Sequence, residues 1–173
     1  MSMTLYAATV PAFRQALDAI AGLLTTAETY CAENKVAASE IISARLAPDM
    51  LPFAFQIKAT AFHSHGAIEG VRQGVLAPDR SPPPDSFAAL QALVADARGA
   101  LAKVEPVEID SFIGRDMRLV LGERHLDFLA EDFLLSFSLP NLYFHSTTAY
   151  DILRWKGLAI GKRDFLGRLR LKA

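Results

Sequence analysis

The chain has little of what several protein classes require. It has one cysteine, Cys31, among 173 residues, which excludes an internal disulfide framework and makes a reducing cytoplasm the expected location. No apolar run approaches the roughly 18 residues that span a bilayer, and the N-terminus lacks the charged and apolar regions of a signal peptide. The net charge of -1 favours neither sign, so we expect neither nucleic acid nor a membrane surface as a partner.

Motifs of common catalytic sites are also absent. The sequence has no Cys-x-x-Cys pair, no Gly-rich phosphate loop and no nucleophile elbow. The composition is rich in apolar residues: 51% of the residues are hydrophobic and 21% are charged. This composition predicts a folded protein with a sizeable core, and the length predicts a single domain spanning residues 1–173.

Apolar residues recur at spacings of three and four along four segments, which predicts four long helices. The strongest stripe runs from Tyr6 to Cys31, with Thr9 as a candidate N-cap. Asp49 is placed to cap the second helix, because Pro52 then falls in its opening turn. The predicted helices span about residues 6–31, 50–73, 86–104 and 130–157.

Two stretches between these helices break the helical pattern. The run VLAPDRSPPPDS (75–86) predicts a long crossover that returns along the bundle. Apolar and polar residues alternate over 117–121 and 125–128, and Gly122-Glu123 between them predicts a two-residue hairpin turn. The expected fold is therefore all-α, a four-helix bundle with a small β-hairpin inserted between helices 3 and 4.

The fourth helix carries polar residues where its apolar stripe should lie. The predicted stripe consists of Leu134, Phe137, Asn141, Phe144, Thr148, Ile152 and Trp155. Asn141 therefore faces inward, and His145 follows one turn later on the same side, where the two could bind one small polar group. Pro140 should kink the helix beside them. The alternative is a hydrogen-bonded polar layer in the core, which is the more common role of a buried asparagine or histidine.

The other histidines offer weaker candidates. His63 and His65 point about 200° apart on a helix and cannot share an ion, so we expect both at the surface. Gln56 and His63 share a face, but about 10.5 Å of helical rise separates them, too far to bind one metal together. His125 should face solvent from the hairpin.

The C-terminal end is basic. Residues 154–173 contain seven basic side chains against one acidic side chain, Asp164. Solvation and helix capping account for most of this charge. The alternative is that it attracts an anionic ligand or an acidic partner.

Three stretches together resemble an uncharacterised bacterial family with the DinB-like fold. They are RLAPDMLPFAFQIK (45–58), LPNLYFHSTTAYDILRWKG (139–157) and IGKRDFLG (160–167). The resemblance covers nearly the whole chain. It implies an up-down-down-up four-helix bundle, which agrees with the long crossover, and it implies a homodimer, because members are often dimeric.

The resemblance also implies the place of a metal site. Relatives in the wider superfamily hold a metal with three histidines, one early in the second helix and two on the fourth. By position, Gln56, Asn141 and His145 stand there in this chain, and only His145 keeps the ligand type. Neutral amides are poor zinc ligands beside imidazole.

Three functions are consistent with these observations. The first is a bundle with a degenerate metal site that binds a small molecule or a partner through Gln56, Asn141 and His145. The second is a DinB-like metal-dependent enzyme, a hydrolase or thiol transferase acting on a small molecule. Its divalent metal, zinc or nickel, would be bound by His145 with Asp49 as the nearest carboxylate, or His145 would act as general acid or base. The third is a regulatory partner protein that uses the basic tail.

Overall fold

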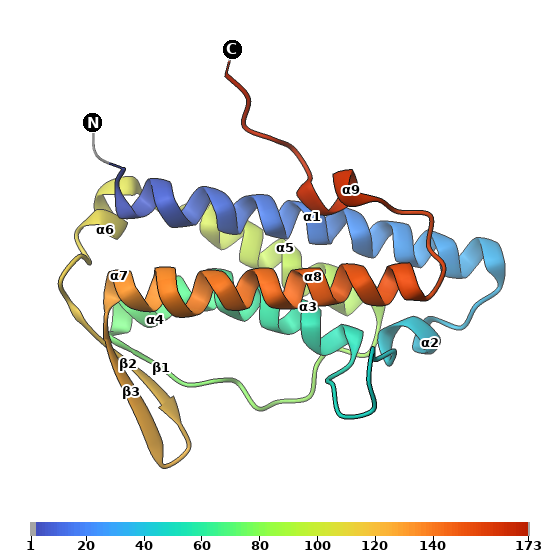
Figure 1. Cartoon of the computed structure of the whole chain (residues 1–173), viewed down its shortest axis with the longest axis horizontal. Coiled ribbons are helices and arrows are strands. Elements are labelled where there is room, and N and C mark those ends of the chain that lie inside the picture. The colour runs from blue at the N-terminus through green and yellow to red at the C-terminus, as the bar shows by residue number, and fades with distance from the viewer. Residues whose placement is uncertain (1–2, 173) are drawn as a thin grey trace.

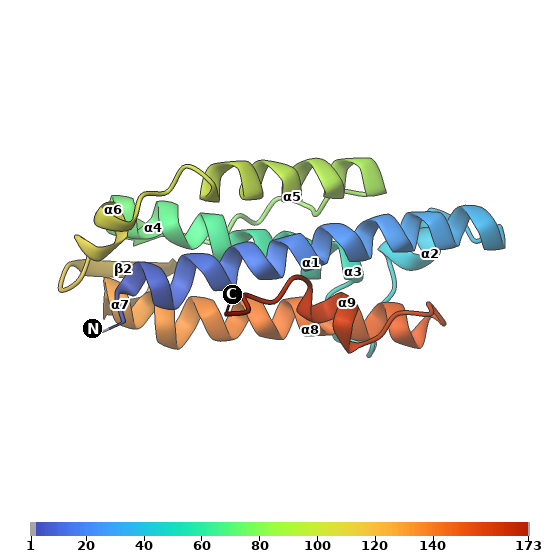
Figure 2. The same ribbon diagram turned by 90° about the horizontal axis from the view of Figure 1, so that it is seen from above.

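The computed structural model describes residues 3–172, which form a mostly helical molecule with one small sheet. Four long helical rods lie alongside one another, and the view from above places α1 between α5 and α8 (Figure 1, Figure 2). The rods are α1 (Leu5–Asn34), α3–η1–α4 (Phe53–Ala61, Phe62–Gly66, Ala67–Gln73), α5 (Phe87–Leu101) and α7–η2–α8 (Ala130–Asp132, Phe133–Ser138, Leu139–Trp155). Short helices lie between and after them: α2 (Ala38–Ile42) between the first and second rods, α6 (Pro106–Asp110) between the third and fourth, and α9 (Lys162–Leu166) after the fourth.

The first rod buries the apolar stripe that its sequence predicts. Val10, Phe13 and Leu17 are fully buried, and the stripe continues to Cys31. The N-cap is Thr4, whose hydroxyl accepts from the backbone N–H of Ala7. The prediction that Thr9 caps this helix was wrong. Thr9 lies in the second turn and donates its hydroxyl hydrogen to the Leu5 carbonyl at 2.7 Å.

The second rod begins later than the sequence suggests. Its N-cap is Pro52, and the helix starts at Phe53. Asp49 lies in the exposed turn before it, out of reach of the first helical N–H groups, so the prediction that Asp49 caps this helix was wrong. The segment η1 then widens the helix by a π-turn. After α4 ends at Gln73, Gly74 caps it with a positive φ of 71°.

A three-stranded sheet covers one end of the bundle. Strands β2 (Asp116–Leu121) and β3 (Arg124–Leu129) form an antiparallel pair that opposes Leu121 to Arg124 across Gly122-Glu123. A short strand that the sequence did not predict, β1 (Val75–Leu76), pairs in parallel with β2. From β1 the loop over residues 77–86 runs back along the molecule to α5 (Figure 1).

The fourth rod differs from its prediction in register. The predicted stripe puts Phe144 and Trp155 in the core, yet they are 58% and 62% exposed. A π-turn takes more residues than an α-turn, so η2 rotates the rest of the rod relative to a stripe counted from Leu134. Leu142 and Leu153 fill the core instead.

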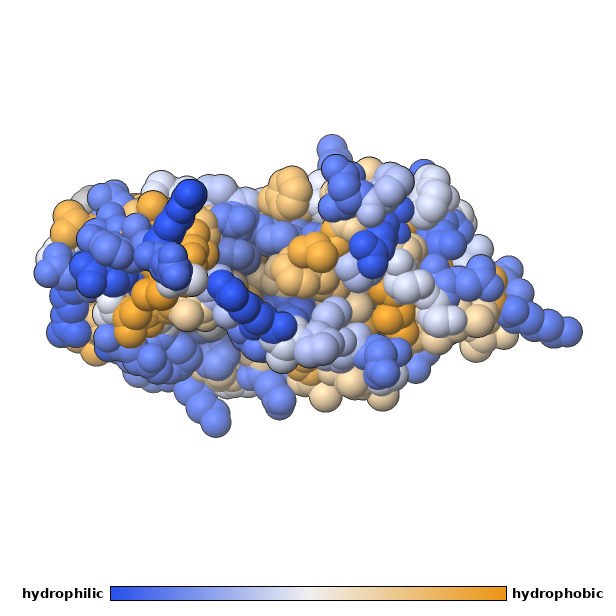
Figure 3. Space-filling view, turned by 90° about the horizontal axis from the view of Figure 1, so that it is seen from below, coloured by the Kyte–Doolittle hydropathy of each residue, from blue (hydrophilic) through white to orange (hydrophobic). Residues whose placement is uncertain are grey.

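The described part of the chain holds no helix that is both long enough and apolar enough to cross a membrane. Apolar side chains gather in separate patches among hydrophilic ones on the face that carries the hairpin and the crossover loop (Figure 3).

Candidate functional site

Gln56 and His145 meet where the second and fourth rods face each other. Gln56 is 2% exposed, and its side chain bridges the Leu51 carbonyl and the His145 ring. The Nε2 of Gln56 donates to the Leu51 carbonyl at 2.8 Å, which fixes the orientation of the amide and leaves Oε1 as an acceptor. Oε1 lies 2.7 Å from Nδ1 of His145. His145 therefore carries its proton on Nδ1, and its Nε2 keeps a lone pair.

His63 joins this pair, and the prediction that it lies at the surface was wrong. The side chain is 7% exposed, and its ring stacks on His145 with centroids 5.5 Å apart and planes 10° apart. The sequence contained the signal, because Gln56 and His63 share a helical face: once Gln56 points inward, His63 does too. His65, two residues further along the chain, is half-buried. Its Nε2 lies 3.3 Å from Oε1 of Glu69.

Asn141 and Asp49 occupy other positions. The Nδ2 of Asn141 donates to the Phe137 carbonyl at 2.8 Å, in the turn where Pro140 has no N–H to offer. Asp49 is exposed, and its carboxylate makes no hydrogen bond or ion pair within residues 3–172. Of the four residues that the sequence singles out, the structure thus brings Gln56 and His145 into contact.

Both π-helical segments deliver side chains to one pocket of about 200 Å³ beside His63. Segment η1 contributes Phe62 and His63, and η2 contributes Phe137. π-Turns recur at functional sites because they aim side chains where a regular helix would not. The full lining is Phe55, Lys58, Phe62, His63, Pro78, Asp79, Leu119 and Phe137. The pocket is therefore mostly apolar, with three phenylalanine rings, one imidazole and an ion pair at its edge.

That ion pair holds the crossover loop over the pocket. The Nζ of Lys58 lies 2.8 Å from Oδ2 of Asp79, and it donates to the Ser81 carbonyl at 2.7 Å. Hydrogen bonds from Lys58 and from Ser81 hold the pKa of the Asp79 carboxyl well below its ordinary value. Pro78 and Asp79 thus form a wall of the pocket that belongs to the loop rather than to a helix.

The two stacked imidazoles are neutral at physiological pH. Burial, and to a smaller degree the neighbouring His145, lowers the pKa of His63 from 6.5 to about 3. Burial also lowers the pKa of His145, to about 4. The Nδ1 of His63 is buried and makes no hydrogen bond to any described residue. Its Nε2 also makes no hydrogen bond to a described residue and is not among the fully enclosed atoms, and the residue lines the pocket.

The residues present do not fit the three-ligand metal centre that the family resemblance implies. Within residues 3–172, no three His, Cys, Asp or Glu side chains lie close enough to hold one ion. The amide of Gln56 is committed to Leu51 and His145. The lone pairs of His63 and His145 lie in nearly parallel planes, so they do not converge on one point.

Comparisons with known proteins agree with this architecture. The crystal structure of a DinB family member protein from Shewanella denitrificans is similar to this chain, with a TM-score of 0.81 and 25% sequence identity. The match covers 98% of this chain and 95% of the other. No curated protein matches the chain significantly. The family described as a domain of unknown function, DUF1993, matches residues 5–166. The chain therefore belongs to the DUF1993 family and has a DinB-like fold.

Proposed function

We propose that the protein is a binding module for a small, mostly apolar molecule, held in the pocket beside His63. The observation that carries the proposal is an imidazole that is 7% exposed, lacks a protein partner at either nitrogen, and lines an aromatic cavity of about 200 Å³. Buried polar groups are normally hydrogen-bonded, so such a ring suits a partner that arrives from outside. An apolar cavity of roughly 150 Å³ accommodates a benzene ring, so this one suits a ring with a short substituent.

The ligand should offer a hydrogen-bond acceptor to His63. An orphaned N–H is rarer than an orphaned acceptor in buried positions, which favours the neutral ring with its proton on Nε2 rather than on the enclosed Nδ1. A carbonyl oxygen on an aromatic ring would then accept from Nε2. The edges and faces of Phe55, Phe62 and Phe137 suit the ring itself.

The same groups are poorly suited to proton transfer. A histidine with a pKa of about 4 is not in its acidic imidazolium form near neutrality, and its neutral form is a weak base. A general acid or base works best with a pKa near the working pH. We therefore assign His145 a positioning role: with Gln56 it supports the ring of His63, in what we take to be a degenerate metal site.

The bundle frames this pocket. We infer the up-down-down-up arrangement of the DinB-like fold, with the hairpin inserted between the third and fourth rods. In this arrangement the loop over 77–86 has to return along the second rod, which is where Lys58 holds it.

We also infer a homodimer through the outer face of α8. Phe144 and Trp155 lie about three turns apart on one side of this helix, and both are more than half exposed. Two large aromatic side chains on one face are typical anchors of a protein interface.

Calorimetric titration with acetophenone tests the binding proposal. Acetophenone combines a ring with a carbonyl, and ethylbenzene has the same shape without the acceptor. We expect His63→Phe to weaken acetophenone binding about tenfold, the scale of one lost hydrogen bond, and to leave ethylbenzene binding unchanged. His125→Phe, an exposed histidine of β3, is the matched control and should bind as the wild type does.

Equal loss of both compounds in His63→Phe would show that the nitrogen plays no part. Failure of the wild-type protein to bind either compound would refute the pocket itself.

A further inference from the structure

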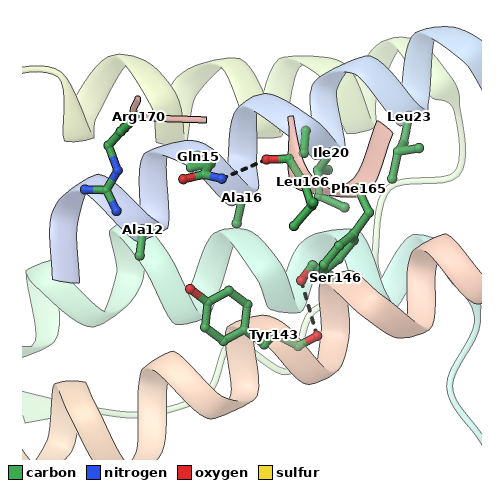
Figure 4. Close-up of a pocket in the computed structure, with 11 residues that line it drawn as sticks. Ala12, Gln15, Ala16, Ile20, Leu23, Tyr143, Ser146, Phe165, Leu166 and Arg170 are labelled. Atoms are coloured by element: carbon green, nitrogen blue, oxygen red, sulfur yellow. Dashed lines mark hydrogen bonds between the residues drawn. The ribbon is translucent and has the colours of Figure 1, made fainter. Parts of the chain in front are cut away.

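A second cavity lies on another side of the bundle, under the C-terminal end of the chain. It has a volume of about 120 Å³ and is bounded by α1, α8 and the segment from α9 to Arg170 (Figure 4). Its lining shares no residue with the pocket beside His63. The run IGKRDFLG supplies part of its roof, although the proposed function leaves that run without a role.

The C-terminal segment is fastened across this cavity on both sides. On the α1 side, Gln15 donates its Nε2 hydrogen to the Leu166 carbonyl at 2.8 Å. On the α8 side, the ring of Phe165 packs edge-on against Tyr150 with centroids 5.8 Å apart. Gly167 has a φ of 61°, and a Cβ there would lie 3.4 Å from that of Ala19, so glycine allows the segment to approach α1 closely.

The cavity is apolar at one end and polar at the other. Figure 4 shows the hydroxyl of Tyr143 and the guanidinium of Arg170 toward the Ala12 end, whereas Phe165 and Leu166 lie toward the Leu23 end. The hydroxyl and the guanidinium make no hydrogen bond or ion pair to any residue from 3 to 172. Among the described residues that line the cavity, Arg170 is the one with a formal charge.

We propose that this cavity is a second binding site, which takes a small aromatic or aliphatic carboxylate. At about 120 Å³ the cavity is smaller than the roughly 150 Å³ that encloses benzene, so its apolar end takes a short aliphatic chain or one edge of a ring whose carboxylate stays at the exposed Arg170. At the polar end, Arg170 offers a planar fork of donors that matches a carboxylate, and Tyr143 offers one more donor. No acidic side chain lines the cavity to oppose an anion. This proposal is independent of the pocket beside His63.

Amide NMR spectra of the full-length protein, titrated with sodium benzoate, test it. We expect saturable shifts at the amides of Ala12, Ala16 and Ala19, with a dissociation constant on the order of 1 mM, a reasonable affinity for so small a molecule. Arg170→Gln should weaken benzoate binding about tenfold, because it removes a charge-assisted contact. The same variant should leave binding of benzyl alcohol, the neutral counterpart, unchanged.

Arg168→Gln is the matched control, because Arg168 belongs to the same segment and does not line this cavity. It should bind benzoate as the wild type does. The proposal is overturned if benzoate causes no saturable shift at the α1 amides, or if Arg168→Gln and Arg170→Gln weaken it equally.

Discussion

At the scale of single residues, the side-chain amide of Gln56 determines which nitrogen of His145 carries the proton. The Leu51 carbonyl orients Gln56, and Gln56 holds the proton of His145 on Nδ1. His63 then stacks on a neutral ring rather than on a cation. Protonating either ring would place a charge in a site from which most water is excluded, which is costly.

The neutral histidines should make the protein less stable in acid. Both have an ordinary pKa near 6.5 when unfolded, and burial lowers it to about 3 for His63 and about 4 for His145. Below pH 6.5 the unfolded chain therefore binds more protons than the folded one. We expect the free energy of unfolding to fall as the pH drops from 6.5, by at most about 1.4 kcal/mol per pH unit for each histidine, and to level off as the folded rings titrate.

Urea unfolding at pH 7, 6 and 5 measures this slope. The slope should be shallower in His63→Phe than in the wild type. His125→Phe should keep the full slope, because His125 is exposed. A slope in His63→Phe equal to that of the wild type would contradict the neutral, buried state of His63.

The sequence located some of these residues but not all. Gln56 and His145 were predicted to lie together from the family resemblance, and the structure places them in contact. His63 was assigned to the surface because it and His65 point about 200° apart on a helix and cannot share an ion. Asn141 was expected to face the same point, but its amide bonds to Phe137 within its own helix.

At the scale of elements, the helices were predictable and their irregularities were not. Hydrophobic spacing predicted four long helices, whereas nothing in it marks a π-turn. Each π-turn shifts the register of the residues that follow, so the expected inward position of Phe144 was wrong even though the helix itself was right. Strand β1 was missed because two residues carry too little pattern.

The crossover loop gives a prediction at this scale. Lys58→Met removes the ammonium that holds Asp79 and Ser81. The stability cost should be at most about 1 kcal/mol, because Asp79 is largely exposed and such pairs are screened. The loop itself should loosen, so the amide of Ser81, which donates to Asp79 at 2.8 Å, should exchange its hydrogen faster.

Hydrogen exchange followed by NMR checks this, with Arg98→Met as the matched control. Arg98 pairs with Asp18 on the surface, away from the loop. Unchanged exchange at Ser81 in Lys58→Met would show that the lysine does not hold the loop.

At the scale of the whole molecule, the exposed aromatic face of α8 bears on assembly. If two copies meet through it, Trp155→Ser should shift the protein toward monomer, because hot-spot tryptophans supply much of the binding energy of an interface. Sedimentation velocity over a range of concentrations measures the shift. Leu126→Ser, which changes a 46% exposed residue of the hairpin, should leave the distribution unchanged. A protein that is monomeric at all concentrations before any substitution would contradict the homodimer.

The central claim is that an accessible nitrogen of His63 binds a small molecule, and its imidazole ¹⁵N signals report this most directly. Long-range ¹H–¹⁵N spectra resolve Nδ1 and Nε2 of each of the four histidines. On saturation with acetophenone, the Nε2 signal of His63 should move as its hydrogen acquires an acceptor, while both signals of His125 stay in place. An unmoved Nε2 of His63 in protein that is saturated with acetophenone would contradict the account.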